Sequence, residues 1–74
     1  MSTYGDFRKV LQKLNFVLVR STKHKTWERI CEDGTILRTR LSHQHGKDIP
    51  KPLFHRMLKQ CKLTEAKFRK LLRG

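Results

Sequence analysis

Residues 26–41 decide the fold, and they read Thr-Trp-Glu-Arg-Ile-Cys-Glu-Asp-Gly-Thr-Ile-Leu-Arg-Thr-Arg-Leu. Asp33-Gly34 near the centre of this stretch is a dipeptide typical of a β-hairpin turn. The runs on either side, residues 26–31 and 36–41, are short and partly β-branched, which predicts two antiparallel strands. Because side chains alternate along a strand, the second run has two distinct faces. One face carries Leu37, Thr39 and Leu41, and the other carries Ile36, Arg38 and Arg40.

The residues before the hairpin predict a helix and one more strand. Helical spacing relates the apolar residues Phe7, Val10, Leu11 and Leu14, which predicts an amphipathic helix with these four residues on one face. Asp6 favours the N-terminal end of this helix, and Asn15 suits its C-terminal end. The period then changes. Phe16-Val17-Leu18-Val19 is a continuous apolar run, which predicts a well-buried strand.

The residues after the hairpin predict two further helices. Pro50 and Pro52 suit the entry into a helix, since proline is tolerated in the first turn. Helical spacing then relates Leu53, Phe54, Met57, Leu58 and Cys61. Thr64 is a predicted N-cap for a short last helix with Phe68, Leu71 and Leu72 on its apolar side. The whole chain, residues 1–74, is therefore predicted to be one α+β domain. Its order is α-β-β-β-α-α, with a three-stranded antiparallel sheet covered on one face by helices.

The charge of the chain points to an anionic partner. Eighteen lysines and arginines stand against six acidic residues, a net charge of +12. The surplus is concentrated in the second half, because residues 38–74 hold eleven basic and two acidic residues. A field of this sign attracts polyanions, whose phosphates release counterions on binding. Nucleic acid is the expected partner, although an acidic protein would also be attracted by this net positive charge.

Composition also sets the expected compartment. The chain has no run of 18 apolar residues, and its first twenty residues do not resemble a signal peptide. We therefore expect a cytoplasmic protein that does not associate with membranes. Its two cysteines, Cys31 and Cys61, are too few for a disulfide scaffold, and we interpret them as buried thiols.

His24 is the residue best placed for proton transfer. It stands between Lys23 and Lys25 in the polar connection before the hairpin. The two ammonium groups disfavour the imidazolium form and leave a neutral ring that can accept a proton. The same lysines would attract a phosphodiester, so His24 could act on a ribose hydroxyl. A solvated loop histidine is the alternative interpretation of these three residues.

Other residues that could carry chemistry give weaker patterns. His43 and His45 can be combined with Cys31 or His55 as metal ligands, but their spacing matches no zinc motif, so neither a metal nor a cofactor is expected. Trp27 and Tyr4 are candidates for base stacking. A lone tryptophan in a short strand is more often part of the core.

The order of these segments resembles the HicA family of bacterial toxins over residues 5–72. The resemblance rests first on Asn15-Phe16-Val17-Leu18-Val19-Arg20, followed by Thr22-Lys23-His24 at the opening of the hairpin with Asp33-Gly34. It rests also on the segment from Gly46 to Leu53, which includes Lys47-Asp48-Ile49-Pro50, and on Met57 to Leu63.

This resemblance implies a fold related to double-stranded-RNA-binding domains and a metal-independent ribonuclease that cleaves messenger RNA. It also implies a HicB antitoxin as partner protein, and it maps the essential histidine of the family onto His24. The expected reaction is transesterification, in which His24 takes the proton of a ribose 2′-hydroxyl or protonates the 5′ leaving oxygen. Water, Lys23 and His43 remain alternatives for the second proton transfer. The residues expected to bind RNA phosphate are Lys23, Lys25, Arg38, Arg40 and Lys47.

Two other functions remain open at this point. The commonest family pattern has a glycine and a serine before the histidine, where this chain has Thr22 and Lys23. A non-catalytic RNA-binding module of the same fold fits that departure. A small interaction protein, whose basic surface serves an acidic partner, fits the charge alone.

Overall fold

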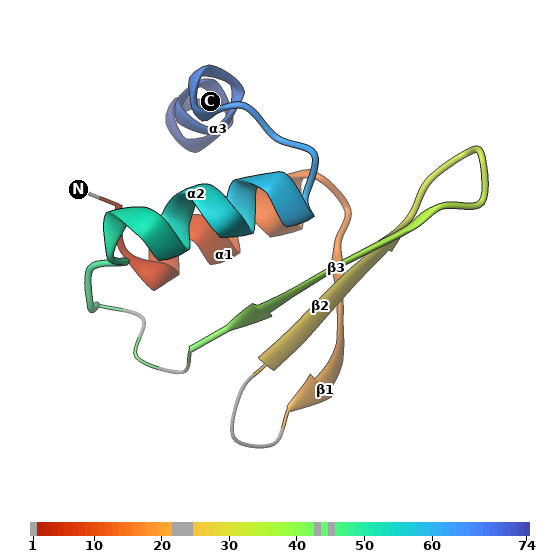
Figure 1. Ribbon diagram of the computed structural model, residues 1–74, viewed down its shortest axis with the longest axis horizontal. Coiled ribbons are helices and arrows are strands. Elements are labelled where there is room, and N and C mark those ends of the chain that lie inside the picture. The colour runs from red at the N-terminus through yellow and green to blue at the C-terminus, as the bar shows by residue number, and fades with distance from the viewer. Residues whose placement is uncertain (1, 22–24, 43, 45) are drawn as a thin grey trace.

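The computed structural model describes residues 2–21, 25–42, 44 and 46–74 of the chain. They form three helices and one sheet in the order α1 (Tyr4–Lys13), β1 (Val17–Ser21), β2 (Lys25–Ile30), β3 (Ile36–Leu41), α2 (Lys51–Gln60) and α3 (Glu65–Arg73). Figure 1 shows α1 and α2 side by side against one face of the sheet, with α3 beyond them. This confirms the predicted α+β class and element order, and it is compatible with a relation to double-stranded-RNA-binding domains. Among the described residues, no helix is both long and apolar enough to cross a membrane.

Helix α1 begins one turn earlier than the apolar pattern indicated. Thr3 is its N-cap, and the Thr3 hydroxyl accepts from the Asp6 N–H at 3.1 Å while the Asp6 carboxylate accepts from the Thr3 N–H at 3.1 Å. Asp6 therefore completes a capping box at the third helical position. Asn15 follows the helix with a φ of 66°, the left-handed conformation that ends helices.

The central hairpin forms as predicted, with Cys31 and Thr35 on either side of a turn of three residues. Residues pair from Lys25 with Leu41 to Ile30 with Ile36 without interruption. Gly34 adopts a φ of 87° in the turn, a conformation that glycine takes without strain. Leu37, Thr39 and Leu41 are buried, whereas Ile36, Arg38 and Arg40 are exposed, as the alternation predicted.

The strand predicted from residues 16–19 is confirmed, but the prediction that it is well buried is wrong. The strand begins at Val17, and Val17, Leu18 and Val19 are 58%, 43% and 50% exposed. The sheet order is β1-β2-β3, so β1 is an edge strand, and its register shifts between Leu18 and Arg20. Of the four residues in this apolar run, only Phe16 is buried, and it enters the core from the connection before the strand.

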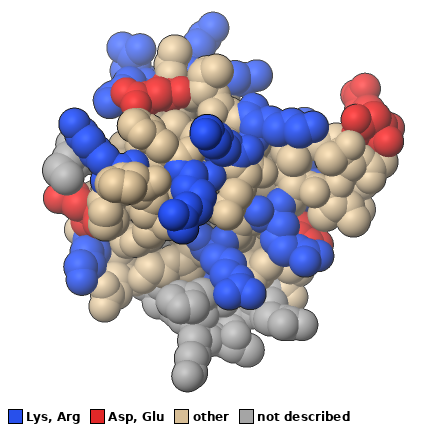
Figure 2. Space-filling model, viewed as in Figure 1, with Lys and Arg blue, Asp and Glu red and all other residues tan. Residues whose placement is uncertain are grey.

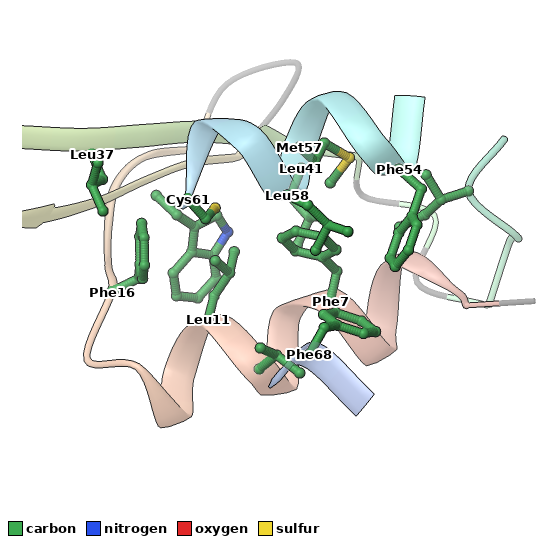
Figure 3. Close-up of a cluster of buried hydrophobic side chains, with 13 residues drawn as sticks. Phe7, Leu11, Phe16, Leu37, Leu41, Phe54, Met57, Leu58, Cys61 and Phe68 are labelled. Carbon is green, nitrogen blue, oxygen red and sulfur yellow. The ribbon is translucent and has the colours of Figure 1, made fainter. Parts of the chain in front are cut away.

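The core lies between the covered face of the sheet and the three helices (Figure 3). The rings of Phe7, Phe54 and Phe68, one from each helix, meet with centroids 5.1–6.0 Å apart. Trp27 is 5% exposed and belongs to this core, so it offers no surface for base stacking. Tyr4 is half-buried. Cys61 is buried as expected, whereas Cys31 is half-buried.

The two C-terminal helices agree with the sequence pattern. Helix α2 buries Phe54, Met57 and Leu58, with proline in its first turn. The Thr64 hydroxyl caps α3 by accepting from the Lys67 N–H at 3.2 Å. These helices leave the opposite face of the sheet uncovered, and that face carries the arginines.

Candidate nucleic-acid interface

The uncovered face of the sheet holds an open depression of about 300 Å³. The strand register places Thr26 opposite Arg40 and Glu28 opposite Arg38. These four residues line the depression together with Val19. Two predicted phosphate-binding arginines, Arg38 and Arg40, are thus two residues apart on the same side of β3. We call this surface the open face.

Arg38 does not present an uncompensated charge on the open face. Its Nε lies 2.5 Å from Oε2 of Glu28, and the Arg38 side chain is 63% exposed. An exposed ion pair of this kind adds about 1 kcal/mol or less to stability, so its main consequence is electrostatic. The carboxylate partly neutralises the guanidinium and would repel a phosphate placed beside it.

Arg40 is nearer than Arg38 to the end of the sheet at which Ser21 and Lys25 pair. Ser21 pairs with Lys25, and Lys25 pairs with Leu41, next to Arg40. Among the described residues Arg40 makes no ion pair. The segment of residues 22–24, which connects Ser21 to Lys25 and contains the predicted Lys23 and His24, lies outside the described residues.

Lys47 stands in the loop that leaves β3 at this same end. Its carbonyl accepts from the Tyr4 N–H at 3.0 Å, and Thr3 pairs with Asp48 in an isolated β-bridge. These contacts fix the loop to the start of α1 and leave the Lys47 side chain exposed. Of the five predicted phosphate-binding residues, the structure brings Arg38 and Arg40 together. It places Lys25 at the adjacent sheet end, Lys47 on a separate loop, and Lys23 outside the described residues.

The charge distribution favours a polyanion over much of the surface. Figure 2 shows lysine and arginine side chains spread across one face of the molecule, with acidic side chains mostly toward its margins. Such an arrangement raises the local concentration of anionic ligands.

The described cysteine, glutamate and histidine side chains at α2 and α3 give no candidate nucleophile or metal site. Burial raises the pKa of the Cys61 thiol to about 12, so this group stays protonated at neutral pH and is no nucleophile. Hydrogen bonds from Arg69 lower the pKa of Glu65, which also lies 3.5 Å from Nε2 of the exposed His55. His55 thus links α2 to α3 rather than facing the open face. Within the described ranges no group of three potential metal ligands occurs. His43 and His45, which were considered as metal ligands above, lie outside these ranges.

Two residues near this surface were not singled out from the sequence. The turn dipeptide alone would not have found Glu28, because a two-residue turn at Asp33-Gly34 places residue 28 opposite Thr39, whereas the observed register places it opposite Arg38. Arg56 of α2 shares a groove with Arg38 and Arg40. No sequence periodicity relates residue 56 to residues 38 and 40, because they belong to different elements.

Comparison with known proteins gives one finding. A family model described as the HicA toxin of bacterial toxin–antitoxin systems matches residues 4–63. Searches of curated proteins and of solved structures found no match.

Proposed function

This chain belongs to the HicA toxin family of bacterial toxin–antitoxin systems, and from that membership we propose that it is a metal-independent endoribonuclease acting on messenger RNA. The observation that carries the proposal is the open face, because it presents Arg40 beside the sheet end to which the His24 segment is attached. A family match without a basic surface at this end would support a toxin but not an RNA substrate.

In the proposed reaction the RNA supplies its own nucleophile. His24 takes the proton of a ribose 2′-hydroxyl, and the resulting oxygen attacks the adjacent phosphorus. The bond to the 5′ oxygen breaks, and this oxygen receives a proton from water, Lys23 or His43. The products are a 2′,3′-cyclic phosphate and a free 5′-hydroxyl, so no external nucleophile or electron donor is required. DNA lacks the 2′-hydroxyl and would bind without being cleaved.

The basic residues act on the charge that develops at phosphorus. Arg40 faces the depression and makes no ion pair among the described residues, so it is the better phosphate ligand of the two arginines. Further contacts to neighbouring phosphates of the RNA would come from Lys23, Lys25 and Lys47. Donors that are already in place stabilise the transition state at little cost in reorganisation. Proteins of this family pair with HicB antitoxins, and we propose that a HicB-like protein masks this surface.

The deciding experiment compares His24→Ala with wild type in cleavage of a purified messenger RNA. We expect cleavage to slow by about 10²–10⁴-fold, with RNA affinity nearly unchanged, because a neutral imidazole adds little phosphate attraction. His55→Ala is the matched control, since it removes an exposed histidine elsewhere on the surface. EDTA should leave the wild-type rate unchanged. Cleavage by His24→Ala at the wild-type rate would remove His24 from the mechanism.

The same experiment decides the second candidate, a non-catalytic RNA-binding module. Thr22 and Lys23, in place of the glycine and serine common in the family, favour that candidate. It requires that the wild-type protein bind RNA with no cleavage above the His24→Ala background.

A further inference from the structure

A groove of about 440 Å³ separates β3 from α2 on the side of the sheet away from β1. Three consecutive strand residues, Arg38, Thr39 and Arg40, form one wall. The other wall is a single stripe of α2, because its residues are spaced at helical intervals. They are Leu53, Arg56, Met57 and Gln60.

The groove lies at the edge of the sheet rather than on either face. Thr39 points toward the helices, whereas Arg38 and Arg40 point to the open face. Because neighbouring side chains on a strand point in opposite directions, a cavity in contact with all three must lie beside the strand. The backbone edge of β3 therefore borders the groove.

This edge is suited to pairing with another strand. β3 is the last strand of the sheet, and its register with β2 is unbroken over six residue pairs. The other edge strand, β1, carries an irregularity between Leu18 and Arg20, a feature that disfavours further pairing. An edge strand presents a row of backbone donors and acceptors that an added strand can satisfy.

The two sides of the groove differ in chemistry. On the helix side the half-buried Leu53 provides apolar surface, whereas Met57 is only 2% exposed. The Thr39 hydroxyl donates to Oε1 of Gln60 at 2.9 Å, which joins β3 to α2. On the open side are Arg40 and Arg38, the latter partly neutralised by Glu28, and Arg56 adds a third guanidinium from α2. Among the residues that the structure describes, no acidic side chain lines the groove. An occupant thus meets apolar surface on one side and positive charge on the other.

We propose that the β3 edge binds an extended segment of a partner protein in which acidic and apolar side chains alternate. The alternation follows from the geometry of a strand, whose side chains would reach Arg40 and Arg38 in one direction and Leu53 in the other. The stripe from residue 53 to 60 spans about 10 Å, which equals about three residues of extended chain. This inference does not depend on RNA cleavage.

Two other occupants fit the groove less well. A second copy of this chain paired through β3 would bring Arg38 and Arg40 of both copies together, and each copy carries a net charge of +12. A strand of RNA would satisfy the arginines, but it lacks the regular donors and acceptors that match a strand edge. It would also set its charged backbone against apolar surface.

The test uses the full chain, labelled for NMR, and a synthetic peptide of about eight residues in which glutamate and valine alternate. We expect the peptide to shift the backbone amides of residues 38–40 and to leave those of residues 17–18 unchanged. Two control peptides are used. One has the same composition with all glutamates at one end, and the other is the alternating peptide with its central amides N-methylated. Both should bind at least about fivefold more weakly.

The matched protein variants are Arg56→Glu and Lys67→Glu. Both residues are exposed and both changes alter the net charge equally, but Lys67 is on α3 and does not line the groove. Arg56→Glu should weaken binding of the peptide by about fivefold or more relative to Lys67→Glu, which corresponds to about 1 kcal/mol. Equal binding of all three peptides, equal loss in both variants, or no binding would each overturn the proposal. If a uridine oligonucleotide shifts residues 38–40 and the peptide does not, the groove is an RNA site and the proposal is wrong.

Discussion

Replacing Leu58 by alanine should lower the free energy of unfolding by about 3 kcal/mol. Leu58 lies on the buried side of α2 and is 5% exposed, within the cluster shown in Figure 3. The substitution removes three carbon atoms, worth about 0.8 kcal/mol each in transfer free energy, and the remaining loss comes from the cavity left behind. A chain of this length has a total stability of about 4–11 kcal/mol, so the loss is a large fraction of it.

Leu18→Ala is the matched control, because it makes the same chemical change at a residue that is 43% exposed on β1. It should cost about 1 kcal/mol, since much of the leucine surface is already in water and no closed cavity forms. Urea unfolding followed by circular dichroism measures both variants. With a slope of about 1 kcal/mol per molar urea, the midpoints of the two variants should differ by about 2 M. Equal midpoints, or a Leu58 effect below about 0.5 kcal/mol, would refute the packing described for α2.

Three further predictions concern binding and reactivity. The logarithm of RNA affinity should fall with the logarithm of salt concentration with a slope near −3.5, if about five phosphates are neutralised on single-stranded RNA; a slope of zero would exclude RNA as the ligand. Arg40→Ala should reduce the size of that slope by about 0.7, whereas Arg38→Ala should change the slope less because Glu28 already pairs with Arg38. RNA titrations of both variants at several salt concentrations measure the two slopes. At pH 8 iodoacetamide should alkylate Cys31 and spare Cys61, as mass spectrometry would show, because burial raises the pKa of the Cys61 thiol to about 12. Equal alkylation of both cysteines in the native state would contradict the burial of Cys61. Because the cysteine thiol of an unfolded chain has an ordinary pKa of 9.0, Cys61 should lower the free energy of unfolding as pH rises above about 9.

The sequence by itself determined the elements and most of their buried faces. The period of the apolar residues placed Phe7, Val10 and Leu11 on the buried side of α1, and Thr64 marked the start of α3, because capping and periodicity depend on neighbours within one element. The existence of the central hairpin was equally local, since Asp33-Gly34 is a dipeptide typical of a hairpin turn. Its register was not, because a two-residue turn at Asp33-Gly34 would place Glu28 opposite Thr39, whereas the structure places it opposite Arg38.

Tertiary structure decided which surfaces are covered and which residues meet from different elements. The run Val17-Leu18-Val19 is apolar, but it is exposed because β1 is at the edge of the sheet, and strand order is not encoded in the composition of one strand. Arg56 meets Arg38 and Arg40 because α2 packs beside β3. The spacing of apolar residues indicates which side of a helix or strand is buried. Which other elements lie against that side depends on how the apolar sides of all the elements are buried together.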